Sequence, residues 1–292
     1  MGSQDHETGR VRSGDAEIFY RRFGRPGRTP VLIAHGLSYF SYDWIGPAAG
    51  IAVDREVVAI DMRGFGQSTW SPGRDYKLET LGADVIALLD HLRWPRAVLM
   101  GHSFGGRVCL ATAGWHPDRA AALICVDFAP DIAPVGRRHV AERIGRQPDV
   151  FASVDAAMAY DGHADVPAAS PVRKRYEAFL RPTTSGYVLR RDLAFRDNFK
   201  RALDAGQSAP VPAYLWPMLS ALEIPALVIR ASESDMFAAE TLAKVGAANP
   251  RIAAIELTGS HDLAGDNPDG LVAAVHDFLS RTETVMTGVQ PD

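Results

Sequence analysis

Six short stretches of the chain are almost entirely apolar, and they recur along most of its length. They occupy residues 30–36, 56–62, 96–102, 121–127, 225–231 and 251–257. Strands of a parallel sheet have near-continuous apolar runs, because helices bury both faces of such a sheet. We therefore expect an α/β fold in which a mostly parallel sheet is wrapped by helices.

The segments around these runs have the periodicities of helices and of one further strand. Residues 17–23 alternate like a strand. In residues 78–94 one helical face is apolar and carries Leu78, Leu81, Val85, Leu88, Leu89 and Leu92. Asn267 and Pro268 supply the N-cap and first position of a final helix. The last eleven residues, 282–292, are polar, and we expect them to fray.

The region from residue 131 to residue 224 breaks this rhythm. It has no comparable apolar run, and its helix-like pieces cover residues 135–146, 170–180 and 189–203. A structureless loop of that length is implausible inside a compact domain. We expect a helical insertion at 131–224, with residues 1–130 and 225–292 together forming the core domain.

Composition excludes several classes of protein. The 292 residues are 47% apolar and 23% charged with a net charge of −4, and no basic run is long enough to suggest nucleic acid as a partner. The N-terminal residues lack the apolar stretch of a signal peptide, and no run approaches the roughly 18 apolar residues of a membrane span. Cys109 and Cys125 lie in apolar stretches and form no CxxC pair. These features predict a cytoplasmic protein with reduced cysteines and no membrane partner.

No sequence motif calls for a cofactor. There is no GxGxxG for a dinucleotide and no clustered Cys/His set for a metal. We therefore expect no cofactor and no metal, with a small-molecule substrate as the partner. Both a monomer and a homodimer stay open.

One G-x-S-x-G sequence occurs in the chain, at residues 101–105, with Ser103 at its centre. It follows an apolar strand run and precedes an apolar helix. A sharp strand-to-helix turn there exposes the serine hydroxyl, and glycines on either side avoid clashes with the neighbouring strand and helix. Ser103 is thus the candidate nucleophile, the alternative being a glycine-rich turn whose serine caps the helix.

A serine nucleophile needs a base, and His261 is the best candidate for it. It follows a buried strand run through a glycine-containing loop and precedes the last helix. Loops at the carboxyl ends of strands are where sites form in such sheets. His35 and His102 also end strand runs, and we expect them to orient backbone, although either is an alternative base.

Five motifs in order resemble the α/β-hydrolase fold superfamily. They are residues 35–44 (HGLSYFSYDW), 61–68 (DMRGFGQS), 101–106 (GHSFGG), 230–237 (RASESDMF) and 259–268 (GSHDLAGDNP). The resemblance spans about residues 15–281 and is strongest to the capped branch that includes epoxide hydrolases and meta-cleavage hydrolases. Epoxide hydrolases and haloalkane dehalogenases of this fold use an aspartate nucleophile, and Ser103 argues against both activities.

The resemblance implies an eight-stranded, mostly parallel sheet with a helical cap inserted after the sixth strand. It also implies an oxyanion hole made by two backbone N–H groups. One belongs to Phe104, the residue after the nucleophile, and the other to Leu37, which follows His35-Gly36. These dipoles would face the developing oxyanion of an acyl-transfer reaction.

The acid that orients His261 has two candidates. Asp127 follows the sixth strand of the expected sheet, and Asp235 lies four residues past the end of the seventh. Members of the superfamily use either place. The Ser-Asp pair in RASESDMF matches the relatives' pattern, with Ala231 in place of the usual glycine, so we favour Asp235. Asp127 is the alternative acid; if Asp235 orients His261, we expect Asp127 to be a hinge or substrate-side residue. Glu233 is expected to face water.

These residues predict a serine hydrolase that forms an acyl-enzyme from a small carboxylic ester or lactone. The alternatives are hydrolysis of an amide or C–C bond, a cofactor-free haloperoxidase- or lyase-like reaction, and a ligand receptor on a hydrolase scaffold. Tyr39, Phe40 and Trp44 are candidates for lining the substrate pocket, with core packing as the alternative. Arg107, one turn beyond Ser103, either binds a substrate carboxylate or braces the helix.

Overall fold

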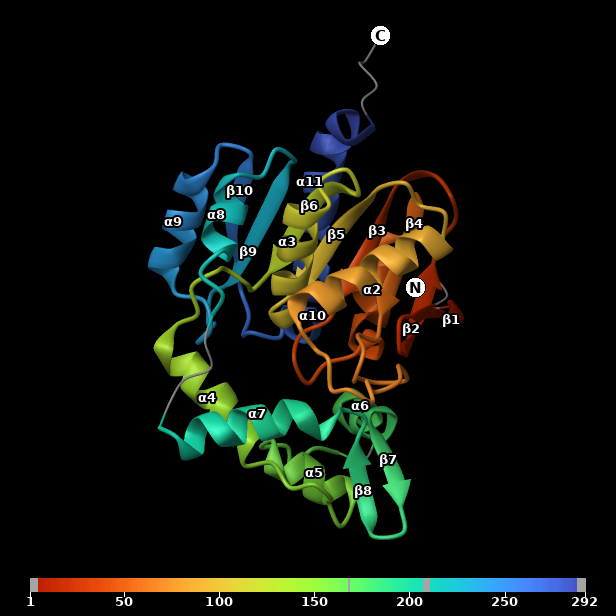
Figure 1. The fold of residues 1–292 in the computed structure, drawn as a ribbon, viewed down its shortest axis with the longest axis vertical. Coiled ribbons are helices and arrows are strands. Elements are labelled where there is room, and N and C mark those ends of the chain that lie inside the picture. The colour runs from red at the N-terminus through yellow and green to blue at the C-terminus, as the bar shows by residue number, and fades with distance from the viewer. Residues whose placement is uncertain (1–4, 168, 207–210, 288–292) are drawn as a thin grey trace.

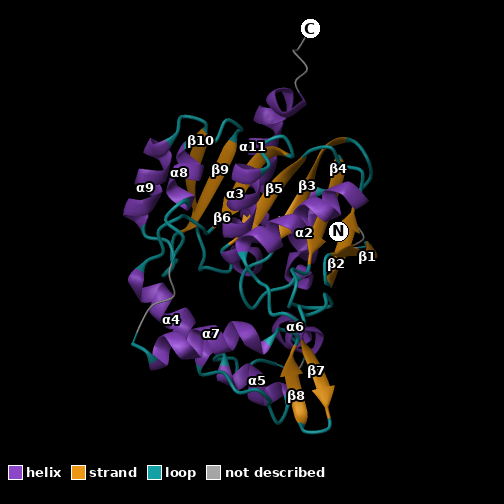
Figure 2. Cartoon of the chain, in the orientation of Figure 1, coloured by secondary structure: helices purple, strands orange, loops and turns teal. Residues whose placement is uncertain are grey.

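The computed structural model describes residues 5–167, 169–206 and 211–287, and its centre is an eight-stranded sheet (Figures 1 and 2). The strand order is β1-β2-β4-β3-β5-β6-β9-β10. Strands β1 and β2 run antiparallel to their neighbours, and all other pairings are parallel. The strands are β1 (Glu7–Ser13), β2 (Ala16–Phe23), β3 (Arg28–Ala34), β4 (Arg55–Ile60), β5 (Ala97–His102), β6 (Ala120–Val126), β9 (Ala226–Ala231) and β10 (Ile252–Leu257). The predicted α/β fold is confirmed.

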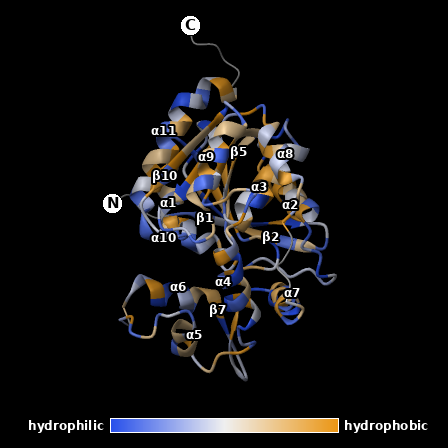
Figure 3. Ribbon diagram, turned by 90° about the vertical axis from the view of Figure 1, so that its left-hand side faces the viewer, coloured by the Kyte–Doolittle hydropathy of each residue, from blue (hydrophilic) through white to orange (hydrophobic). Residues whose placement is uncertain are grey.

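The apolar runs of the sequence form the central strands. Every residue of β4, β5, β6 and β9 is buried, because helices cover both faces of the sheet there. Figure 3 shows the hydrophobic colouring concentrated on the strands. Strand β1 was not expected, since it lies at the edge of the sheet and most of its side chains are polar and exposed.

Two apolar layers flank the sheet. Leu32 and Ala34 of β3 pack on one face with helices α2 (Leu78–His91), α3 (Phe104–Trp115), α8 (Leu215–Ser220) and α9 (Ala239–Ala248). Val31 and Ile33 pack on the other with the 3-10 helix η1 (Ser41–Trp44) and helices α1 (Ile45–Ile51), α10 (Leu263–Asp266) and α11 (Pro268–Thr287). Alternate residues of each strand thus serve opposite layers.

The expected fraying of residues 282–292 is wrong for its first half. Helix α11 extends to Thr287, and Met286 is buried. The carboxylate of Glu283 accepts the backbone N–H of Thr29 at 2.9 Å and pairs with Arg55 at 3.1 Å. Glu283 docks here because Thr29 in β3 and Arg55 in β4 supply hydrogen-bond donors. Composition alone does not reveal such contacts. Residues 288–292 lie outside the described residues.

The segment between β6 and β9 lies over one end of the sheet in Figure 1. It contains α4 (Pro134–Gly145), α5 (Val154–Tyr160), α6 (Pro171–Phe179), α7 (Leu193–Asp204) and a hairpin of β7 (Leu180–Thr183) and β8 (Gly186–Leu189). A small apolar cluster of its own joins Phe151, Met158 and Tyr176. Its last helix, α8, instead packs against α3 in the core layer. The hairpin was not expected, because two four-residue strands are too short to show a pattern.

Candidate active site

Ser103 lies at the sharp turn between β5 and α3. Its φ of 51° and ψ of −114° place it outside the ordinary helix and strand regions. A Cβ on Gly101 would lie 2.2 Å from the carbonyl oxygen of Gly105, and one on Gly105 would lie 2.1 Å from that of Ala34. The two glycines are therefore required by close backbone approach, and the expected strand-to-helix elbow is present.

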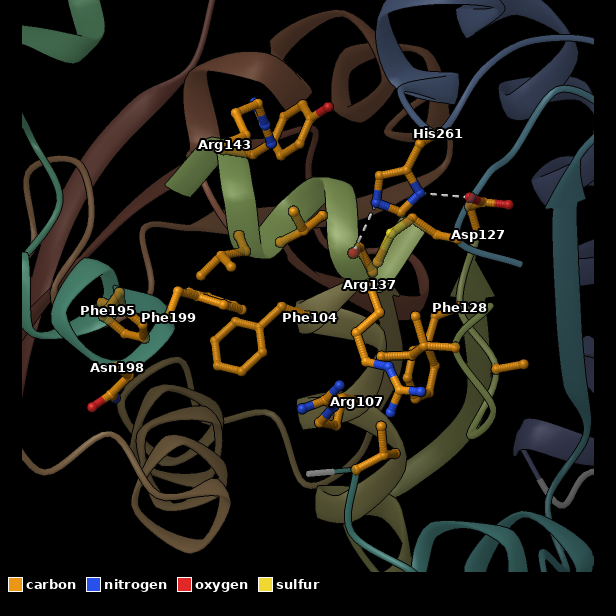
Figure 4. A pocket seen from close by; sticks show the side chains of 18 of the residues that line it. Phe104, Arg107, Asp127, Phe128, Arg137, Arg143, Phe195, Asn198, Phe199 and His261 are labelled. Atoms are coloured by element: carbon orange, nitrogen blue, oxygen red, sulfur yellow. Dashed lines mark hydrogen bonds and ion pairs between the residues drawn. The ribbon is translucent and has the colours of Figure 1, made fainter. Parts of the chain in front are cut away.

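Ser103, His261 and Asp127 form one hydrogen-bonded chain (Figure 4). The Oγ of Ser103 lies 2.9 Å from Nε2 of His261. The other ring nitrogen of His261, Nδ1, lies 2.5 Å from Oδ2 of Asp127. The three residues follow β5, β10 and β6 respectively, so the carboxyl ends of parallel strands bring them to one edge of the sheet.

The expectation that Asp235 contacts His261 is wrong, and its rival Asp127 occupies that place. The Asp127 side chain is fully buried, and it accepts hydrogen bonds from the Ala231 N–H at 2.8 Å and the Ser234 hydroxyl at 2.5 Å. Asp235 is 43% exposed and pairs with Nδ1 of His139 on α4 at 2.8 Å. The turn after β9 directs Ser234, one residue earlier, toward the site. Glu233 is exposed, as expected.

The backbone at Asp127 is strained. Its φ is 44°, a left-handed conformation that is uncommon for a residue other than glycine. Its N–H bonds the carbonyl of Ile229 in β9 at 2.7 Å, which holds the turn in place. Strained residues cluster at functional sites, where the surroundings over-determine their conformation.

His35 and His102 bond backbone groups beside the site. Nδ1 of His35 lies 2.8 Å from the carbonyl of Gly36, and its Nε2 accepts the Met62 N–H at 3.0 Å. Nε2 of His102 lies 2.8 Å from the carbonyl of His261. Burial lowers the pKa of His35 to about 4 and that of His102 well below its usual value. The histidine that meets the Ser103 hydroxyl is His261.

Leu37 and Phe104, the expected oxyanion-hole residues, both line the cavity that contains Ser103. Phe104 is the first residue of α3, so its N–H has no acceptor within the helix. Among the described residues, neither the Leu37 N–H nor the Phe104 N–H has a hydrogen-bond acceptor. The oxyanion hole itself stays a prediction.

We call this cavity the Ser103 pocket, and its volume is about 260 Å³. Tyr39 and Arg107 line it, together with Asp127 and His261. The remaining lining residues come mainly from the loop after β6 and from α4 and α7, with single residues before α2, before α8 and after β9. They are Tyr76, Phe128, Ala129, Ile132, Arg137, Val140, Arg143, Phe195, Asn198, Phe199, Val211 and Met236.

Phe40 and Trp44, expected at the pocket, lie elsewhere. Phe40 is 2% exposed and stacks on Phe179 of α6 at 4.9 Å between ring centroids. Trp44 is 1% exposed in the core layer beside α1 and α11. Core packing, the alternative for this aromatic cluster, describes both residues.

Known proteins share this architecture. The family model described as "alpha/beta hydrolase fold" matches residues 29–260. The chain belongs to the α/β-hydrolase fold family. The structure of E-2-(acetamidomethylene)succinate hydrolase is similar to this α/β hydrolase, with a TM-score of 0.79 and 23% identity, over 94% of this chain and 100% of the other. At that identity the likeness shows the fold.

Two curated relatives match this α/β hydrolase over most of their length. The 3-hydroxybutyrate-oligomer hydrolase of Cupriavidus necator is 27% identical, over 84% of this chain and 86% of its own. The esterase YbfF of Escherichia coli is 25% identical, over 86% of this chain and 93% of its own. Such relatives support a hydrolytic enzyme.

Several pocket residues of this α/β hydrolase were not predicted from the sequence. Arg137, Val140 and Arg143 repeat every three residues along α4. Phe195, Asn198 and Phe199 on α7 follow the i, i+3, i+4 spacing of one helical face. These spacings were the available signal, but they do not distinguish a face over a cavity from one in contact with another helix.

The described part of the chain has no group of three His, Cys, Asp or Glu side chains arranged to hold a metal ion. It also has no helix long and apolar enough to cross a membrane. Cys109 and Cys125 are free and buried, and burial raises the pKa of Cys109 well above its usual value and that of Cys125 to about 12, which leaves both as unreactive core residues. The cytoplasmic location and the small-molecule partner stay predictions.

Proposed function

We propose that the protein is a serine hydrolase that cleaves a small carboxylic ester or lactone through Ser103, His261 and Asp127. The observation that carries this proposal is the continuous hydrogen-bonded chain from Ser103 Oγ through both ring nitrogens of His261 to Asp127. In that arrangement Asp127 accepts the Nδ1–H of His261, which leaves the Nε2 lone pair free to accept the serine proton.

The chemistry proceeds in two halves. Ser103 attacks the ester carbonyl while His261 takes its proton, and the tetrahedral oxyanion receives the N–H groups of Leu37 and Phe104. The intermediate collapses as His261 protonates the departing alcohol, which leaves an acyl group on Ser103. Water, deprotonated by His261, then attacks the acyl carbonyl and releases the acid, which restores Ser103.

Two of the relatives favour an ester over the other bonds that this machinery can cleave. One is named an esterase and another hydrolyses 3-hydroxybutyrate oligomers. The small Ser103 pocket, about 260 Å³, suits a small molecule rather than a polymer chain.

Labelling with a fluorophosphonate probe tests the proposal, because the probe reacts with an activated serine. We expect labelling of the wild-type protein and none of Ser103→Ala. Wild type should also hydrolyse members of a panel of short-chain aryl esters and lactones, with turnover that disappears in Ser103→Ala. Absence of both labelling and Ser103-dependent turnover would contradict the proposal and favour a receptor or a non-hydrolytic reaction.

A further inference from the structure

Arg107 is a cation in the wall of the Ser103 pocket, and its side chain has no partner among the described residues. It lies one turn after Ser103, and its backbone N–H bonds the Ser103 carbonyl at 3.2 Å. Its Nε is sealed from solvent and has no hydrogen-bond acceptor among the described residues. Within those residues, no carboxylate lies within ion-pair distance of its guanidinium. Burial lowers the pKa of Arg107, with a partly opposing contribution from Tyr214.

This surrounding does not fit a brace for the helix. A bracing arginine would donate to a carbonyl or a carboxylate of a neighbouring element, as Arg119 does to the Pro95 carbonyl at 2.9 Å. A guanidinium Nε–H that is sealed from solvent without an acceptor is costly, because it has lost its water and gained no hydrogen bond in return. Unpaired buried polar groups of this kind are explained when a ligand supplies the missing acceptor.

A second arginine in the pocket wall repeats the pattern. Arg137, on α4, also has a solvent-sealed Nε without an acceptor among the described residues. In Figure 4 the side chains of Arg107 and Arg137 both extend into the pocket. Arg143 adds a third cation to the wall, with Asp161 as its partner at 3.8 Å.

The pocket has too little negative charge to balance these arginines. Among its described lining residues, Asp127 is the only carboxylate. Asp127 is already engaged by His261, Ser234 and Ala231. Residues 207–210, which precede Val211 and are not described, are Gln-Ser-Ala-Pro and carry no charge in the sequence. The lining is therefore cationic in the absence of substrate.

Most of the remaining lining is apolar or aromatic. Phe104 and Phe128 come from the core, while Phe195 and Phe199 come from α7. A substrate for such a pocket has an apolar body and one anionic group. A carboxylate suits the arginines, because its two oxygens match the parallel N–H donors of a guanidinium.

We propose that the ester substrate carries a free carboxylate in addition to its scissile carbonyl, and that Arg107, assisted by Arg137, binds this carboxylate. This inference rests on the proposed ester hydrolysis. It assigns Arg107 as a residue that determines substrate specificity, and it explains why its side chain finds no partner among the described residues.

Paired esters with and without a free carboxylate test the inference. Monomethyl esters of straight-chain diacids place the carboxylate on the acyl side, and acetoxy acids place it on the alcohol side; the corresponding fully methylated esters are the neutral partners. At pH 7.5 wild type should prefer the anionic member of at least one series in kcat/KM. Arg107→Met should lower the ratio of kcat/KM for that anion to kcat/KM for its neutral partner by about 10- to 100-fold.

Matched variants separate the pocket from general charge effects. Arg138 lies next to Arg137 on α4, but its side chain is 78% exposed and pairs with Glu142. Arg138→Met should leave the anion preference unchanged, whereas Arg137→Met should reduce it. Arg107→Lys should keep part of the preference, because the charge stays while the forked geometry is lost.

Thermal unfolding adds a readout that does not depend on activity. The Tm of Arg107→Met should equal or exceed that of wild type, because a half-buried cation whose Nε lacks an acceptor among the described residues is removed. Adipate should raise the Tm of wild type and of Ser103→Ala but not that of Arg107→Met. A bracing role predicts a lower Tm for Arg107→Met and no effect of adipate.

The outcomes distinguish this inference from the proposed function. Ser103-dependent hydrolysis of neutral esters, with no preference for either anionic series and no effect of adipate, would overturn the inference and leave the proposed function standing. No Ser103-dependent hydrolysis of any ester would overturn the proposed function, and the inference with it.

Discussion

The hydroxyl of Ser234 donates to Oδ2 of Asp127 at 2.5 Å, and that same oxygen faces Nδ1 of His261. Ser234 Oγ in turn accepts the backbone N–H groups of Met236 and Phe237 at 3.1 and 3.0 Å. The turn after β9 thus fixes the carboxylate through Ser234. Ser234 is therefore a positioning residue, which acts through Asp127 rather than on the substrate.

Ser234→Ala should lower kcat about tenfold with little change in KM, because Asp127 loses a donor that orients it toward His261. Steady-state kinetics on the best ester of the panel measures the split. Ser234→Thr, which keeps the hydroxyl, should recover most of the activity. Ser232→Ala, two residues earlier, is the control and should resemble wild type. Equal kcat for wild type and Ser234→Ala would show that Asp127 is held without this bond.

Gly105→Ala should destabilise the fold by about 2–3 kcal/mol, since its Cβ would lie 2.1 Å from the backbone carbonyl oxygen of Ala34. Denaturant unfolding followed by circular dichroism measures the free energy. Gly46→Ala, in α1, is the matched control: nothing lies within 4 Å of its added Cβ, and its stability should change by less than about 1 kcal/mol. Similar stabilities for the two variants would show that the elbow relaxes easily.

The free energy of unfolding should carry a contribution from His35 that is lost in acid. Its folded pKa, about 4, lies below the usual 6.5 because of burial. Above pH 6.5 both the folded and unfolded states hold this histidine neutral. Between pH 6.5 and 4 only the unfolded state gains the proton, so stability falls by about 1.4 kcal/mol per pH unit from this group.

The difference between wild type and His35→Gln isolates that contribution. Burial raises the pKa of Asp61 and of Asp84, which changes stability with pH in the opposite direction. Both proteins share those carboxylates. The stability advantage of wild type over His35→Gln should therefore shrink as the pH falls from 6.5 to 4. A constant difference across that range would contradict neutral burial of His35.

The elbow and the histidine of the site could be predicted from the sequence. Ser103 and His261 each follow an apolar strand run in a loop of distinctive composition, and topology alone brings such loops together. The same runs predicted the central strands, but not the polar edge strand β1 or the short hairpin.

The acid could not be chosen by the same means. Asp127 and Asp235 follow β6 and β9, which are neighbours in the sheet, so both end near the same edge. Which of the two carboxylates reaches His261 depends on the local turn that follows each strand. Asp127 comes directly after its strand with a φ of 44°, whereas the chain after Ala231 turns Ser234 inward and Asp235 outward to His139. Backbone strain of this kind leaves no periodic trace in the sequence.

The role of the pocket arginines could not be decided from the sequence, for a different reason. Arg107 was recognised as a candidate, but its lack of a partner is a property of the packed structure. Arg137 lies on a helix whose polar residues also read as a solvated surface. Only the contact of α4 with the cavity separates a solvated face from a binding face.

The most direct test of the triad compares kcat for Asp127→Asn and Asp235→Asn on the same ester. An asparagine at the orienting position holds His261 in the wrong tautomer, so Asp127→Asn should lower kcat by roughly 10⁴-fold. Asp235→Asn, which loses only an exposed contact with His139, should stay within about threefold of wild type. A large loss in Asp235→Asn with near-normal activity in Asp127→Asn would contradict the triad of Ser103, His261 and Asp127.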